Sequence, residues 1–165
     1  MSTLPLIAHR RPDAVVAWRG GTPVSVRQFL GEVAHVAGQL PPGRHVLNLC
    51  SDRYRFTVAL AACIVSGRIS LLPSTHTPEM VRQMQRIAPD VFCIVDQGAG
   101  VELPTFRYPE SVPPPGADLA IPAIDREQVV ALVFTSGSTG VPTSHVKRWG
   151  SLVRNVQAEA ERLGI

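Results

Sequence analysis

The sequence predicts an α/β protein: a layered αβα domain with a mostly parallel sheet, plus a small N-terminal β-hairpin. Two observations predict it. Short apolar runs at 45–49, 69–72, 91–95 and 129–134 are bounded by turn residues, as buried strands are. Between several of these runs lie stretches with apolar residues three and four apart, the spacing of an amphipathic helix. Strands that alternate with helices favour a parallel sheet covered on both faces.

The first half of the chain supplies the hairpin and two helices. Segments 14–18 and 22–25 flank Arg19–Gly20–Gly21, which is a hairpin signal. Ser25 can cap a helix that Pro41–Pro42–Gly43 ends. After the strand at 45–49, a second helix ends at Gly67, and 69–72 is the next strand. The apolar face of the first helix holds Val26, Phe29, Leu30, Val33, Ala37 and Leu40, and that of the second holds Phe56, Ala59, Leu60, Cys63 and Ile64.

The second half begins with a helix at Thr77–Pro78, a cap followed by proline at the first helical position. A buried strand at 91–95 follows. Residues 98–125 hold six prolines and keep no period, so we expect an extended surface crossing there. The run 129–134 is expected to be a central strand of the sheet. A last helix at 151–163 presents Leu152, Val153, Val156 and Leu163 on one side, and such an apolar face favours a partner, a homodimer among the options.

Composition excludes several classes of function. Apolar residues make up 45% and charged residues 18%, as in a soluble globular protein. The net charge is +3 but the basic residues are scattered and aromatics are 5%, so no nucleic-acid partner is expected. No stretch has the roughly 20 apolar residues of a membrane span. Cys50, Cys63 and Cys93 are expected to be buried reduced thiols, and without a signal peptide we expect a cytoplasmic protein.

The most informative segment is the loop at 135–142. It follows the apolar strand and places four hydroxyl residues and two glycines within six positions: Thr135, Ser136, Gly137, Ser138, Thr139 and Gly140. Glycine permits close backbone approach, and successive N–H groups can hold an anion. Neither a Walker P-loop nor a dinucleotide fingerprint is present, because Val141 and Pro142 follow Gly140. The pattern therefore predicts a polyphosphate-binding loop of another kind.

The string Thr-Ser-Gly-Ser-Thr-Gly-x-Pro resembles the signature of the adenylate-forming (AMP-binding) superfamily, which includes acyl-CoA synthetases and peptide-synthetase adenylation domains. The order of the outer segments, including Leu71–Leu72–Pro73 and Pro89–Asp90–Val91, resembles the amino-terminal part of these enzymes. The resemblance implies ATP-dependent activation of a carboxylic acid to an acyl-adenylate, with Mg²⁺ and with coenzyme A or a carrier-protein thiol as acceptor. It implies an AMP-forming acid–thiol ligase, of the acyl-CoA synthetase kind.

This sequence departs from the family pattern at two positions. Thr143 stands where a lysine usually follows Gly-x-Pro, and Trp149 stands where a histidine is often found. Lys147 could bring its ammonium to the phosphates on a flexible stem, or it could be a solvated surface lysine. His145 could contact a phosphate or face water. The phosphate site implied here is therefore residues 135–140 together with Lys147, with no catalytic residue and no metal ligand in this segment.

The resemblance also implies that the acid-binding, adenine-binding and magnesium-binding groups lie downstream of residue 165. We therefore expect residues 1–165 to be an amino-terminal subdomain that needs the missing downstream domains and is inactive alone. An alternative is a non-catalytic interaction or scaffold domain derived from the same fold. An unrelated kinase-like protein is disfavoured, because Gly-Lys-Ser/Thr is missing.

Overall fold

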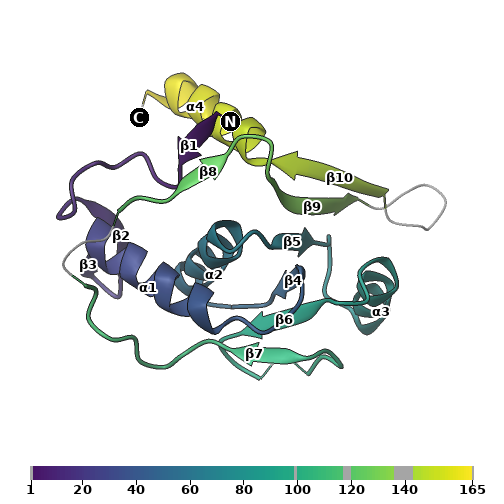
Figure 1. The fold of residues 1–165 in the computed structure, drawn as a ribbon. Helices are drawn as coiled ribbons and strands as arrows, with labels where there is room; N and C mark the ends of the chain where they lie inside the picture. Colours follow the sequence, from purple (N-terminus) through teal and green to yellow (C-terminus); the bar gives the residue numbers. More distant parts are fainter. Residues whose placement is uncertain (1, 99, 117–119, 136–142, 165) are drawn as a thin grey trace.

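A computed structural model describes residues 2–98, 100–116, 120–135 and 143–164. Its centre is a six-stranded sheet in the order β10-β9-β5-β4-β6-β7 (Figure 1). Every neighbouring pair is parallel except β9 and β10, which are antiparallel. The predicted mostly parallel α/β architecture is confirmed, and β9 lies inside the sheet between β5 and β10. The strands are β4 (His45–Asn48), β5 (Ile69–Leu72), β6 (Phe92–Val95), β7 (Thr105–Arg107), β9 (Val129–Thr135) and β10 (Thr143–Arg148).

In the described part of the chain, four helices accompany the sheet, and three of them begin at residues whose side chains cap the helix. The hydroxyl of Ser25 accepts a hydrogen bond from the backbone N–H of Gln28, whose side chain bonds back to Ser25, forming a capping box. Asp52 caps the second helix, and Thr77 caps the third. These caps supply partners for N–H groups that no helical carbonyl reaches. The helices are α1 (Val26–Gln39), α2 (Arg53–Val65), α3 (Pro78–Ile87) and α4 (Trp149–Leu163).

The sheet separates two apolar cores. Val46 and Leu47 are neighbours on β4 and both are fully buried, yet they belong to different cores because side chains alternate across a strand. Val46 packs in the larger core with α1 and α2. Leu47 packs with Val81 and Met84 of α3. The result is the layered αβα arrangement that the sequence predicts, with α3 on the opposite face from α1 and α2.

The hairpin near the amino terminus forms as expected from β2 (Val15–Arg19) and β3 (Thr22–Ser25). The Pro-rich stretch 98–125, expected to be an extended surface crossing, also contributes β7 to the sheet and β8 (Ala123–Asp125) to a pair with β1 (Thr3–Pro5), which the sequence did not predict. Three-residue strands are too short to show a period in the sequence. β10 was also unexpected, since an exposed edge strand does not need apolar residues.

The last helix, α4, lies beside β8 and β10 (Figure 1). It begins two residues earlier than expected, directly at the end of β10. Backbone N–H groups of Trp149 and Gly150 donate to the carbonyls of Gln128 and Arg126, which fixes the start of the helix against the segment before β9. Within the described ranges, no helix has both the length and the apolar character to cross a membrane.

Candidate phosphate-binding site

The carboxyl ends of parallel strands meet at one edge of a sheet, and ligands bind at that edge in open α/β folds. Here β4, β5, β6, β7 and β9 run in the same direction. Thr135 is the last residue of β9, so its exposed side chain lies at this edge. The predicted phosphate loop therefore starts where the fold places ligand-binding segments.

The loop connects β9 and β10 as a hairpin, in which Thr135 pairs with Thr143. The two ends of the seven-residue connection are thus held side by side. Ser136, Gly137, Ser138, Thr139 and Gly140 lie outside the described residues, so their role stays a prediction. Of the predicted site residues, the structure places Thr135 and Lys147.

His145 contacts the base of the loop. Its Nε2 lies 3.3 Å from Oγ1 of Thr135, in a hydrogen bond across the hairpin. In an antiparallel pair, directly opposite residues share a face, and here His145 lies opposite Val133. The ring therefore reaches diagonally to Thr135 on that same face. The sequence singled out His145 without a partner, because only the strand register shows this proximity.

Lys147 is further from the loop. It lies opposite Ala131 and is half-buried, four residues beyond the Thr135–Thr143 pair. Four residues of strand span about 13 Å, more than a lysine's four-carbon stem covers. Lys147 and His145 lie on the same face of β10, so a ligand above that face would meet both. The proposed contact of Lys147 with phosphate stays a prediction.

A second structured feature at this edge joins the ends of β4 and β6. One carboxylate oxygen of Asp96 accepts hydrogen bonds from the backbone N–H and the hydroxyl of Ser51, at 2.9 and 3.0 Å. The other accepts from the N–H of Asp52 at 2.8 Å. Burial raises the pKa of Asp96, but these hydrogen bonds outweigh that effect and hold the pKa below its ordinary value. Asp96 thereby fixes the start of α2, a role that the sequence did not reveal.

The three cysteines are buried and free, as expected. Burial raises the pKa of the Cys50 and Cys63 thiols to about 12, so both are neutral near pH 7 and unsuited to nucleophilic attack. Across residues 2–98, 100–116, 120–135 and 143–164, no group of three His, Cys, Asp or Glu side chains could hold a metal ion.

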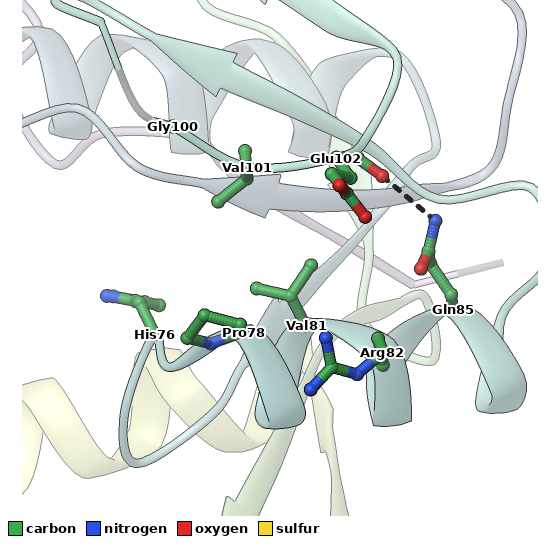
Figure 2. Close-up of a pocket in the computed structure, with 8 residues that line it drawn as sticks. All are labelled: His76, Pro78, Val81, Arg82, Gln85, Gly100, Val101 and Glu102. Atoms are coloured by element: carbon green, nitrogen blue, oxygen red, sulfur yellow. Dashed lines mark hydrogen bonds between the residues drawn. The ribbon is translucent and has the colours of Figure 1, made fainter.

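A separate hollow of about 400 Å³ lies between α3 and the segment around residues 100–102. Figure 2 shows Val81 and Gln85 pointing from α3 toward that segment. The amide of Gln85 donates to the backbone oxygen of Glu102 at 3.1 Å, and Arg82 is paired with Glu79 at 3.1 Å. The hollow contains none of the predicted phosphate-site residues, and much of its polar lining is already paired within the protein.

An apolar groove of about 420 Å³ runs between α4 and the segment Leu4–Ala8. Leu152, Val153 and Val156 line it from α4; the first two are half-buried, and Val156 is 68% exposed. Leu163, further along α4, is 65% exposed. The exposed apolar side of the last helix that the sequence predicts is therefore present. Val156 and Leu163 are among the exposed large apolar residues of the described chain.

Solved structures that match this fold include adenylate-forming enzymes. The o-succinylbenzoate CoA synthetase MenE from Bacillus subtilis, in complex with the acyl-adenylate intermediate OSB-AMP, matches with a TM-score of 0.75 and 18% identity, over 99% of this chain and 47% of that chain. The chain has the fold of the amino-terminal part of adenylate-forming enzymes. The resemblance inferred from the loop sequence is thereby confirmed at the level of fold.

Two other adenylate-forming structures agree. The N-terminal subdomain of Klebsiella oxytoca NpsA matches with a TM-score of 0.65 and 16% identity, over 87% of this chain and 39% of that chain. McyG A-PCP complexed with phenylalanyl-adenylate matches with a TM-score of 0.67 and 16% identity, over 87% of this chain and 26% of that chain.

The sequence is also similar to short segments of peptide synthetases. Malformin synthetase mlfA from Aspergillus homomorphus is 31% identical over 170 residues, covering 94% of this chain and 3% of the relative. The FR901469 synthetase from Dothideomycetidae sp. is 27% identical over 175 residues, covering 96% of this chain and 1% of the relative. The chain thus spans a few per cent of these relatives. No family model matches it.

Proposed function

We propose that this chain binds the phosphates of ATP within an enzyme that converts a carboxylic acid to an acyl-adenylate. The observation that carries the proposal is the position of Thr135, at the carboxyl edge of the sheet and at the start of the Thr-Ser-Gly-Ser-Thr-Gly-x-Pro sequence. The adenylate-forming fold of the solved neighbours supports it. Residues 1–165 are proposed to be the amino-terminal subdomain, with 135–142 as the phosphate-binding loop.

In the proposed reaction, the substrate carboxylate attacks the α-phosphorus of ATP and pyrophosphate leaves. The chain's task is to hold the β- and γ-phosphates while negative charge grows on the leaving group. The hydroxyls of Thr135, Ser136, Ser138 and Thr139 and the backbone N–H groups of Gly137 and Gly140 are donors, which suits an acceptor-only phosphate. Mg²⁺ supplies most of the neutralising charge when it is bound with ATP.

The acceptor of the acyl group is proposed to be a thiol, either of coenzyme A or of a carrier protein. The CoA synthetase MenE favours the first, and the peptide-synthetase relatives favour the second. The chain matches less than half of the MenE chain. The complete reaction is therefore proposed for the protein that carries this chain together with the rest of that fold, and residues 1–165 alone are expected to be inactive.

The test is acid-dependent ATP–pyrophosphate exchange by the intact protein, with a panel of aliphatic, aromatic and amino acids. Replacing Ser138 and Thr139 by Ala removes two hydrogen bonds to a charged group, each worth about 1.5–3 kcal/mol. Exchange should slow about a hundredfold or more, since 1.4 kcal/mol is tenfold. Ser144→Ala, on the adjoining strand and the opposite face from His145, is the matched control and should leave exchange unchanged. Absence of exchange with every acid would contradict the proposed function.

A second candidate is a non-catalytic interaction domain with the same fold. The exposed Val156 and Leu163 on α4 favour it, because apolar residues aligned on a helix surface mark contact sites. In that case the intact protein would show no exchange, and Val156→Asp with Leu163→Asp would abolish self-association or partner binding in analytical ultracentrifugation. Exchange that persists in the same variant would favour the enzymatic function.

A further inference from the structure

We propose that His145 is a positioning residue for the phosphate site, because it donates a hydrogen bond to Thr135 and so directs the Thr135 hydroxyl hydrogen toward bound phosphate. This inference rests on the proposed function. It names a residue that the loop sequence does not contain and that the strand register brings to the loop.

The side chains of His145 and Thr135 lie close together. Nε2 of His145 lies 3.3 Å from Oγ1 of Thr135, which is within hydrogen-bonding distance for a ring nitrogen and a hydroxyl. Both side chains are exposed, so a ligand at the sheet edge can reach them. The hairpin register holds the two strands in this alignment, because Thr135 pairs with Thr143 and His145 pairs with Val133.

The direction of this hydrogen bond depends on which nitrogen of His145 carries the proton. A threonine hydroxyl has one hydrogen and two lone pairs, whereas a phosphate oxygen only accepts. If Thr135 gave its hydrogen to His145, it would turn a lone pair toward the phosphate and repel it. An Nε2–H on His145 instead occupies a lone pair of Thr135 and leaves the hydroxyl hydrogen for the ligand. The pair is therefore productive with the proton on Nε2.

His145 is the basic residue of β10 that comes first after the loop. Thr143, which pairs with Thr135 at the second end of the hairpin, carries no charge. Lys147 starts about 13 Å further along β10. His145 is nearer, at two residues from the loop, and its ring already touches the first loop hydroxyl.

The experiment measures MgATP affinity by calorimetry and pyrophosphate-exchange kinetics in the intact protein. His145→Ala should weaken MgATP binding and raise the ATP KM by about two- to tenfold, the worth of one ordinary hydrogen bond, with kcat changed less than about twofold. His145→Gln keeps an amide donor and should recover most of the affinity. His145→Glu only accepts, so it should bind ATP more weakly than His145→Ala.

Two control variants distinguish the positioning role of His145 from the general effects of losing a histidine or adding a charge. His35→Ala removes an imidazole that is hydrogen-bonded to Gln39 on α1, at 2.8 Å and away from the loop, and should leave ATP affinity unchanged. Ser144→Glu adds the same charge as His145→Glu on the other face of β10. If His145→Glu loses more ATP affinity than Ser144→Glu, the hydrogen-bond role of His145 is supported. Equal losses of ATP affinity overturn it.

A double-mutant cycle decides whether His145 acts through Thr135. In a Thr135→Val background, His145→Ala should have no further effect on ATP affinity; a full additive loss would overturn the inference. Failure of the wild-type protein to bind ATP or catalyse exchange would reject the proposed function itself. A wild-type protein that is active and a His145→Ala variant with the same KM would reject only the role of His145. Circular dichroism and urea unfolding confirm that each variant folds.

Discussion

The hydroxyl of Tyr108 donates a hydrogen bond of 2.6 Å to Oε1 of Glu32, which lies 76 positions earlier in the chain. The hydroxyl of Tyr54 donates to the other oxygen of the same carboxylate at 2.8 Å. Glu32 belongs to α1, Tyr54 to α2, and Tyr108 directly follows β7. One carboxylate therefore ties both helices of the larger core to the Pro-rich stretch that leaves the sheet.

We expect Tyr108→Phe to destabilise the fold by about 1.5–3 kcal/mol, the worth of a hydrogen bond to a charged group. Tyr108 is only 3% exposed, so water cannot replace the lost hydroxyl easily. The ring still stacks under Arg55, whose guanidinium carbon lies 5.4 Å from its centre, so the packing is retained. Urea unfolding measures the change. Tyr54 is less buried, so Tyr54→Phe should destabilise the fold less than Tyr108→Phe. A larger loss of stability with Tyr54→Phe would argue against this role of the Glu32–Tyr108 hydrogen bond.

The hydrogen bonds of Tyr54 and Tyr108 to Glu32 also predict a loss of stability at alkaline pH. Burial, and then the hydrogen bond to Glu32, raise the pKa of both Tyr54 and Tyr108 above the ordinary 10.0. The folded state then keeps protons that the unfolded chain releases. The stabilisation is complete below pH 10 and is lost as pH rises above it.

Each such tyrosine contributes a slope of up to about 1.4 kcal/mol per pH unit in this range. The Tyr108→Phe variant should therefore lose less stability than the wild type between pH 10 and 11.5, measured by urea unfolding at each pH. The thiols of Cys50 and Cys63 ionise near pH 9.0 when unfolded but near pH 12 when buried, so they add a similar pH dependence to both proteins, which the comparison removes. Parallel stability curves for the two proteins would show that Tyr108 ionises normally.

Local signals in the sequence predicted most of the fold. The caps Ser25 and Thr77 and the apolar runs of β5 and β9 are each contained within a few residues, so periodicity and turn chemistry detect them. The strands β1, β7 and β8 have three residues each, too few for a pattern, and they form only because a neighbour supplies the pairing.

Only the part of the candidate site that is contiguous in the sequence was predictable. The loop at 135–142 is a contiguous signature, so its composition alone points to phosphate. The hydrogen bond between Thr135 and His145 depends on the register of a strand that the sequence did not reveal, and the contacts of Asp96 with Ser51 span 45 positions. Such contacts are products of tertiary pairing, which no local pattern encodes.

Two glycines should respond to alanine in opposite directions. Gly43 has φ +128°, and a Cβ there would lie 2.6 Å from the backbone oxygen of Asp90. Gly43→Ala should therefore cost at least about 1–3 kcal/mol, since neither the backbone nor the carbonyl can move freely. Gly38 lies inside α1 with nothing within 4 Å of its Cβ position. Gly38→Ala should stabilise the protein by about 0.5–1 kcal/mol. Thermal and urea unfolding of both variants in the same buffer measure the two changes in stability. The prediction is contradicted if both variants are stabilised or both are destabilised.

The predicted contact of Lys147 with phosphate can be tested by substitution. If its ammonium meets the phosphates above the face that it shares with His145, Lys147→Ala should raise the ATP KM in pyrophosphate exchange by the intact protein. The rise should be larger at low salt, because charge contacts are screened over about 10 Å at 0.1 M salt.

Arg154→Ala removes the same charge from the exposed surface of α4 and controls for net charge. An equal effect of both variants would indicate long-range attraction of ATP. No effect of Lys147→Ala at any salt concentration would show that Lys147 is a solvated residue on the edge strand and takes no part in holding the nucleotide.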